Sequence, residues 1–125
     1  MKLRTREFAL RALRLAAALP RTPEADVIKR PLVRSGTAVA AGYRAACRAK
    51  SNADFVYKLG VVEEEADETA LWLELIVADA MLPAGKVAPL LAEAGELTAI
   101  MVSSRRTARG TRAPANPKSK FQDRK

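Results

Sequence analysis

The chain has 125 residues, a formal net charge of +8 and a single cysteine, Cys47. This length suits one domain with its own core, and one cysteine excludes an intramolecular disulfide and favours a reducing compartment. Hydrophobic residues make up 49% of the chain and aromatic residues only 5%. Such an alanine- and leucine-rich composition favours helices over sheets. We expect Cys47 to be a small buried apolar residue, the usual environment of a free cysteine.

Charge is unevenly distributed along the sequence. Residues 1–58 carry 13 Lys and Arg against 4 acidic residues, residues 59–104 carry 1 against 9, and residues 105–125 carry 8 against 1. One interpretation is that a basic first half complements an acidic third helix within the fold. The other is a basic surface that attracts polyanions. Both interpretations stay open for the folded part, and the second is favoured for the C-terminal segment.

The first twenty residues predict a helix rather than a signal peptide or a membrane span. Their apolar residues recur at spacings of 4, 3 and 4, which places them on one helical face: Phe8, Ala12, Leu15 and Leu19. Arg11 and Arg14 interrupt the apolar run well short of the ~18 residues of a span. We expect a first helix over residues 3–19, ended by Pro20, in a cytoplasmic protein without a membrane segment.

A second helix is predicted over residues 24–48. Pro31 lies inside it and removes one backbone donor, so we expect a kink there or a late start near Leu32. The side chains expected to face inward are Leu32, Ser35, Val39 and Tyr43. Small residues between them would allow close contact between helices: Gly36, Ala40 and Gly42.

The clearest helix is the third, predicted over residues 52–81. Ser51 followed by Asp54 is typical of a capping box, which marks the N-terminus of a helix. Apolar and small residues then alternate spacings of 4 and 3, at Phe55, Leu59, Val62, Ala66, Thr69, Leu73, Ile76 and Ala80. A heptad seam of this kind suits left-handed bundle packing. Pro83 and Gly85 are expected to end the helix.

A fourth helix is predicted over residues 87–106, with a seam at Leu90, Ala94, Leu97 and Met101. The sequence thus predicts an all-α protein, a four-helix bundle over residues 1–106. Residues 107–125 lack apolar periodicity and contain two prolines, so we expect them to form a disordered basic C-terminal tail.

The third helix also carries large apolar residues nearly opposite its seam. At 100° per residue these are Leu71, Trp72, Leu75 and Leu82. We interpret them as a subunit interface. The alternatives are scattered surface leucines, which are common on soluble proteins, or cover by the C-terminal tail.

The acidic run Glu63–Glu68 could suggest a metal site, but the chain has no histidine and the run lies on one helix. We instead expect ion pairs between Glu65 and Glu68 and the arginines Arg34 and Arg44. Ser35 has no His or Lys at a recognisable spacing, and no glycine-rich phosphate loop is present. We therefore predict no catalytic residue, no metal and no cofactor.

One stretch carries a family resemblance. Its pattern is Arg-Ser, then Tyr-Arg, then Ser ahead of Phe and Lys, then Glu-Ala-x-Glu-Thr and Trp-Leu. Those positions are Arg34 and Ser35, Tyr43 and Arg44, Ser51, Phe55 and Lys58, Glu65, Ala66, Glu68 and Thr69, and Trp72 and Leu73. In this combination the chain resembles the four-helix-bundle family of proteins encoded in 23S rRNA intervening sequences, over residues 5–109.

The resemblance implies an antiparallel up-down bundle, commonly assembled as a homopentamer. It extends to the accessory protein of diversity-generating retroelements, a basic pentamer that binds a reverse transcriptase and nucleic acid. The chain departs from the family pattern at Gly42, where the family often has Asn before the Tyr.

Together these observations predict a non-enzymatic, homo-oligomeric bundle that binds RNA or DNA through phosphate contacts. Low sequence specificity is expected, because aromatic residues for base stacking are not interleaved with the basic ones. The candidate contacts are Arg4, Arg11, Arg14, Arg30, Arg48, Lys50, Arg105, Arg106, Arg109 and Arg112. The alternative is a protein-only scaffold or adaptor that binds a protein partner and has no nucleic-acid role. An enzyme is the least favoured class.

Overall fold

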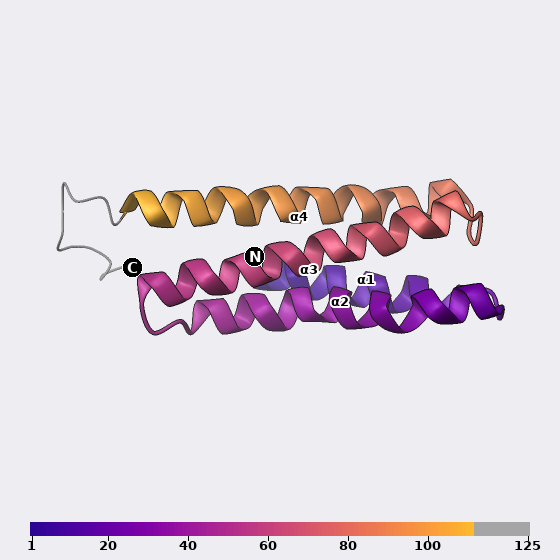
Figure 1. The fold of residues 1–125 in the computed structure, drawn as a ribbon, viewed down its shortest axis with the longest axis horizontal. Coiled ribbons are helices and arrows are strands. Elements are labelled where there is room, and N and C mark those ends of the chain that lie inside the picture. Colours follow the sequence, from indigo (N-terminus) through magenta and orange to yellow (C-terminus); the bar gives the residue numbers. More distant parts are fainter. Residues whose placement is uncertain (112–125) are drawn as a thin grey trace.

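A computed structural model describes residues 1–111 of the chain (Figure 1). These residues form four helices and no strand: α1 (Lys2–Ala17), α2 (Pro23–Cys47), α3 (Asn52–Ala78) and α4 (Ala84–Thr111). The predicted all-α four-helix bundle is therefore confirmed. Most of the predicted C-terminal tail, residues 112–125, lies outside the described residues.

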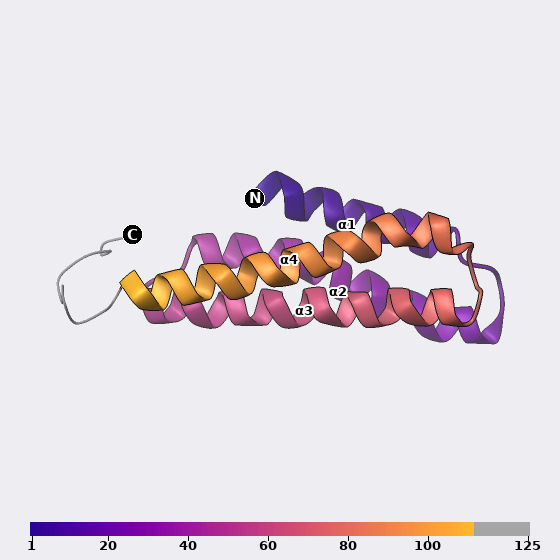
Figure 2. The same cartoon turned by 90° about the horizontal axis from the view of Figure 1, so that it is seen from above.

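The helices run up and down in chain order, so that sequence neighbours are antiparallel (Figures 1 and 2). Each helix packs against the next, whereas α1 and α4 make a much smaller contact. With 16 residues, α1 is also much shorter than the others, which have 25 to 28. Its N-terminus lies part way along the bundle, so one end of the molecule is built from α2, α3 and α4 alone (Figure 1).

The predicted seams form the core. All the interior α3 positions are buried, namely Leu59, Val62, Ala66, Thr69, Leu73 and Ile76. So are the α4 positions Leu90, Ala94, Leu97 and Met101. The two ends of the α3 seam differ, since Phe55 is half-buried and Ala80 is exposed. Near Phe55 the bundle has only three helices, which leaves this side chain less covered.

Helix α2 starts at Pro23, before the late start near Leu32 that was one of the two predictions. Thr22 caps it by accepting a hydrogen bond from the Ala25 amide at 3.1 Å, and Pro23 occupies the first turn, where a missing donor costs nothing. The helix then continues through Pro31, so the predicted late start at Leu32 is wrong. The missing donor of Pro31 would have served Val27, whose side chain is largely exposed.

Two glycines of α2 allow the close helix contacts that their small size predicts. A Cβ at Gly36 would lie 2.6 Å from the Ala12 Cβ of α1, and a Cβ at Gly42 would lie 3.0 Å from Val62 Cγ2 of α3. Any side chain at Gly36 would therefore push α1 and α2 apart.

The start of α3 is as predicted, and its end is not. The Ser51 hydroxyl accepts from the Asp54 amide at 3.0 Å, and the Asp54 carboxylate accepts from the Lys50 amide at 3.1 Å. At the other end Ala80 adopts a left-handed conformation with φ 53°, and the Met81 amide bonds back to the Ile76 carbonyl at 3.0 Å. This Schellman arrangement stops the helix at Ala78, before the expected Pro83 and Gly85.

Helix α4 extends beyond its predicted end at Arg106. Ala108 is buried, and its carbonyl accepts a hydrogen bond from Asn52 Nδ2 of α3 at 3.0 Å. This tertiary contact continues the helix to Thr111. The prediction that Cys47 is buried is wrong, because Cys47 is exposed. It lies at the end of α2, where the bundle has only three helices (Figure 1).

Residues 84–110 of α4 are long and apolar enough to cross a membrane by length and composition alone. Their largest apolar side chains are nevertheless committed to the protein interior, including Val87, Leu90, Leu97 and Met101. The side of α4 that faces away from the bundle carries mostly small residues, among them Ala88, Ala92, Gly95 and Ala99.

Candidate nucleic-acid interface

The motif residues of α2 and α3 meet in one polar cluster, which we call the clasp: Arg34, Ser35, Glu65, Glu68, Thr69 and Trp72. Arg34 Nη2 lies 2.9 Å from Glu65 Oε1 and 2.8 Å from Glu68 Oε1. Trp72 Nε1 donates to Glu68 Oε2 at 3.1 Å, and the buried hydroxyls of Ser35 and Thr69 are hydrogen bonded at 2.8 Å. The clasp joins two helices, and both of its carboxylates are paired with Arg34.

The electrostatics of the clasp follow from this geometry. The Arg34 guanidinium holds the pKa of Glu68 below its usual range, and the Trp72 hydrogen bond acts in the same direction. The two carboxylates in turn raise the pKa of Arg34. The expected partner Arg44 makes no ion pair within residues 1–111. No group of His, Cys, Asp or Glu in the described part of the chain is arranged to hold a metal ion.

Arg4 is held in a second cluster, between α1 and α4. Its Nε lies 2.7 Å from Glu93 Oε2, and its Nη2 lies 2.7 Å from Glu96 Oε1. Arg4 lowers the pKa of Glu93, and the charge of nearby Arg11 adds to the effect. Arg4 therefore belongs to the internal charge pairing, and it is a poorer phosphate contact than its sequence position predicts.

Most of the other candidate arginines gather at the three-helix end of the bundle. We call this region the basic end and define it by Arg48, Lys50, Arg105, Arg106 and Arg109. The Asn52–Ala108 hydrogen bond brings the α2–α3 loop against the end of α4, so residues from distant parts of the sequence lie at one end (Figure 1). Every member except Arg105 is exposed. Arg112, also a predicted contact, lies outside the described residues.

Two carboxylates near the basic end are engaged, whereas Glu64 stays exposed. Lys58 Nζ lies 2.6 Å from Asp54 Oδ2, and together with the Lys50 amide it lowers the pKa of Asp54. Glu63 accepts from Arg105 of α4. The exposed cations of the basic end are thus left with an excess positive field.

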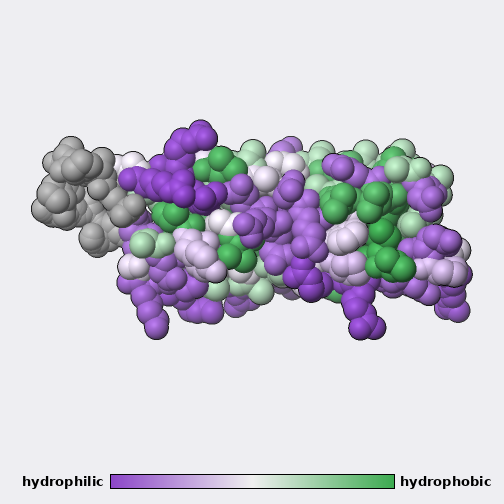
Figure 3. Space-filling model, viewed as in Figure 1, coloured by the Kyte–Doolittle hydropathy of each residue, from purple (hydrophilic) through white to green (hydrophobic). Residues whose placement is uncertain are grey.

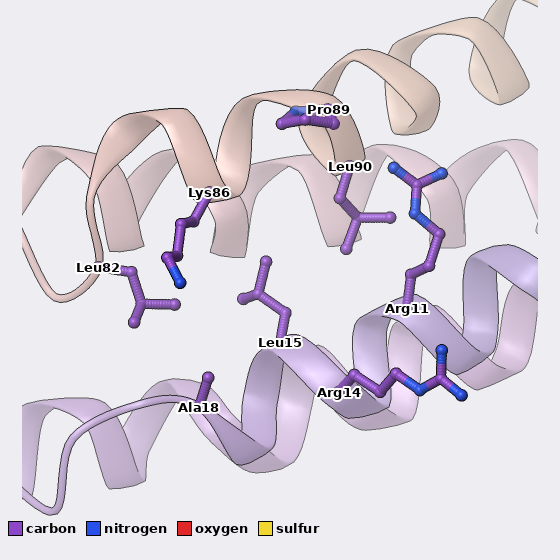
Figure 4. Close-up of a pocket in the computed structure, with 8 residues that line it drawn as sticks. All are labelled: Arg11, Arg14, Leu15, Ala18, Leu82, Lys86, Pro89 and Leu90. Atoms are coloured by element: carbon purple, nitrogen blue, oxygen red, sulfur yellow. The ribbon is translucent and has the colours of Figure 1, made fainter.

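A second basic region lies at the far end of the α1–α4 seam. Arg11 and Arg14 of α1 and Lys86 of α4 surround a cavity of about 260 Å³. Figure 4 shows Leu15 and Leu90 pointing toward each other across its apolar floor, with Lys86 on one side and Arg11 on the other. No carboxylate lines it, so the groove suits a small anion. Arg30, on the outer side of α2, belongs to neither basic region.

Two site residues were missed from the sequence. Lys86 is the lone basic residue in an otherwise acidic stretch, and its helical phase alone gave no reason to place it beside α1. Tyr57 of α3 lines a groove of about 540 Å³ between α3 and α4, together with Arg105 and Arg109. Along the sequence, aromatic residues are not interleaved with the basic ones, whereas the fold places the Tyr57 ring beside Arg105 and Arg109.

Part of the predicted outward apolar face of α3 is exposed in the structure. Val27 precedes Arg34 by one heptad, and Trp72 and Leu75 follow Glu65 and Glu68 by one heptad. Because α2 and α3 are antiparallel, the clasp geometry brings Val27 beside Trp72 and Leu75. With Leu71 these residues form what we call the apolar patch, where Leu71 is 46% and Leu75 40% exposed. Figure 3 shows apolar side chains gathered over this part of α2 and α3.

Leu82 does not belong to the apolar patch. Its predicted place assumed that α3 continues past Ala78, whereas the left-handed Ala80 redirects the chain. Leu82 instead lines the α1–α4 cavity and packs against the core.

Comparison with known proteins fits this architecture. Residues 2–103 match the family model of the 23S rRNA-intervening sequence protein. The chain belongs to this family. No match is found among curated proteins. A crystal structure of a protein of unknown function from the S23 ribosomal protein family of Bacteroides thetaiotaomicron superposes with a TM-score of 0.78. It is 30% identical in sequence, and the alignment covers 84% of this chain and 97% of that one.

The structure gives the residues behind the 23S rRNA-intervening sequence resemblance a physical role. The Arg-Ser pair of α2 and the Glu, Thr and Trp positions of α3 are the clasp, which joins α2 to α3. Gly42 replaces the common family Asn, and the approach of Val62 leaves little room for a larger side chain there. The family motif therefore reflects a contact that stabilises the fold. The candidate nucleic-acid contacts are other residues, at the basic end.

Proposed function

We propose that the protein is a non-enzymatic, homo-oligomeric four-helix bundle that binds RNA or DNA through phosphate contacts, with little sequence specificity. The observation that carries this proposal is the basic end, where exposed Arg48, Lys50, Arg106 and Arg109 gather while Asp54 and Glu63 are already paired. Unpaired cations in one region attract the phosphate backbone by releasing its counterions. A cytoplasmic location suits this role and the single cysteine.

Assembly would strengthen such binding. One subunit offers a modest number of phosphate contacts, and copies in one particle present them to the same strand at high effective concentration. The apolar patch is the surface we propose for assembly, and the family resemblance suggests five subunits. The family name, which refers to intervening sequences of 23S rRNA, makes RNA a natural first ligand to test.

A protein-only scaffold is the second candidate. It is favoured by the apolar patch, because exposed apolar surface of this kind commonly marks a protein contact. It is also favoured by the clasp and the Arg4 cluster, which use many charges for internal pairing. A scaffold would bind a protein partner and would show no salt-dependent affinity for nucleic acid.

The test compares three full-length triple variants, each of which removes three positive charges. The first changes the basic end (Arg48→Gln, Lys50→Gln, Arg109→Gln). The second changes the α1–α4 groove (Arg11→Gln, Arg14→Gln, Lys86→Gln). The control changes three cations that lie outside both regions and are not among the predicted contacts (Arg6→Gln, Arg21→Gln, Lys29→Gln). Fluorescence anisotropy is measured with a generic RNA and a duplex DNA across a salt series.

We expect affinity to fall steeply with salt, and the basic-end variant to flatten the slope by about 0.9 per lost duplex contact. The control should keep the wild-type slope. If the groove variant flattens it instead, the site lies on the α1–α4 seam. Absence of binding to either nucleic acid at low salt would remove the proposal and leave the scaffold.

A further inference from the structure

The groove between α3 and α4 has an aromatic side chain at its mouth. Tyr57 is 70% exposed, which is unusual for a large ring that the bundle could have buried. Ala53, Val56 and Val61 give the groove an apolar surface, and Arg105 and Arg109 of α4 bring positive charge to the opposite wall. Its volume of about 540 Å³ lies in the range of small-molecule binding sites, so a nucleobase can enter it.

The arginine wall is held in place by the fold. Arg105 lies across α3 at Gly60, where an added Cβ would make an ordinary contact of 3.5 Å with its Nε. The other end of Arg105 donates to Glu63, which fixes the guanidinium against the helix. Arg109, one turn further along α4, is exposed and makes no ion pair within the described residues. Arg105 therefore shapes the groove, and Arg109 is free to meet a ligand.

This combination matches the chemistry of single-stranded nucleic acid. An aromatic ring stacks on the face of any base, and a neighbouring arginine contacts the phosphate that follows it. A duplex hides its base faces and can use only the phosphate contact. We propose that the α3–α4 groove binds one nucleotide of a single strand, with the base stacked on Tyr57 and its phosphate at Arg109. This inference rests on the proposed function and adds a preference for single strands.

One acidic residue helps to define the pose. Glu64 also lines the groove and is exposed, so it repels a phosphate on its own side. The phosphate is thereby directed toward α4. Removing this charge with Glu64→Gln should tighten binding of a single strand. The core should be unaffected, because the Glu64 side chain is exposed.

The experiment measures anisotropy of the full-length protein with three labelled probes of equal length. These are a single-stranded oligo(dT), the same strand built from abasic units, and a duplex. We expect oligo(dT) to bind about fivefold or more tightly than the abasic strand, since stacking accounts for that difference. Tyr57→Ala should abolish the preference without changing the salt slope, and Tyr57→Phe should keep it. Arg109→Gln should lower the slope and leave the preference.

Equal binding of oligo(dT) and the abasic strand by the wild-type protein would overturn the stacking inference and leave the phosphate proposal standing. Absence of binding to all three probes would overturn both. Sedimentation and circular dichroism of Tyr57→Ala provide the remaining check. A change in its assembly state would show that Tyr57 serves a subunit contact, which also overturns the inference.

Discussion

Gly36 marks a close approach of α1 and α2. With no Cβ on Gly36, α1 can place the Ala12 side chain directly against the α2 backbone. Phe8 and Leu32, the large side chains of this interface, are fully buried on either side of the contact. Because protein interiors are packed to near-crystalline density, neither helix can move away without opening gaps around these side chains.

Gly36→Ala should destabilise the protein by about 1–3 kcal/mol, because the added methyl group would lie 2.6 Å from Ala12 Cβ. The helix propensity of alanine offsets only part of this cost. Gly95→Ala is the matched control, since a Cβ there has no neighbour within 4 Å. It should stabilise the helix by about 0.5–1 kcal/mol. Urea unfolding followed by circular dichroism measures both, and equal effects of the two variants would contradict the argument.

Arginine–carboxylate ion pairs join neighbouring helices in addition to their apolar packing. The clasp joins α2 to α3, Arg4 joins α1 to α4, and Arg105 joins α4 to α3. Exposed ion pairs contribute little to stability singly. Their value here is in orientation, because a bidentate guanidinium fixes the register of one helix against another.

Stability should depend on pH through these carboxylates. The pKa values of Glu68 and Glu93 are lowered in the folded protein, so their contribution is present above the unfolded-state pKa. It is lost as pH falls through the folded-state pKa. We expect the free energy of unfolding to decrease as pH is lowered from 5.5 to 3. Glu93→Gln should flatten that dependence, by no more than the one-proton limit of about 1.4 kcal/mol per pH unit.

Glu74→Gln provides the control for this pH dependence. Glu74 is exposed and forms no ion pair within residues 1–111, so its removal should leave the slope of stability against pH unchanged. Chemical denaturation at a series of pH values gives the slopes. An unaltered slope in Glu93→Gln would show that Arg4 and Glu93 separate in solution.

The helical period was enough to predict the elements and their buried seams, because burial in a bundle follows the same period as the helix. Helix ends were less predictable, since they depend on contacts between distant residues such as Asn52 and Ala108. The same limit applies to the site. Arg4 and Glu93 are 89 residues apart, and nothing local indicates that they pair. Tyr57 likewise becomes part of a basic groove only when α4 packs beside α3.

Two surfaces of the molecule have no partner within residues 1–111. The basic end carries exposed cations, and the apolar patch carries Val27 at 72%, Leu71 at 46% and Leu75 at 40% exposure. The patch sits next to the clasp, where Arg34, Glu65 and Glu68 fix the relative position of α2 and α3. A preformed apolar surface with a charged border is typical of an interface between protein chains.

Introducing charge into the apolar patch should separate the proposed subunits. Leu71→Lys with Leu75→Lys places two like charges in a surface that assembly would remove from water, and an unpaired buried charge is strongly unfavourable. Sedimentation velocity should then show the mass of a single chain, with helical content unchanged, because both side chains lie outside the core. Ala88→Lys with Ala92→Lys adds the same charge to the exposed side of α4 and should leave assembly intact. A wild-type protein that sediments as a single chain at all concentrations would rule out self-association through this patch.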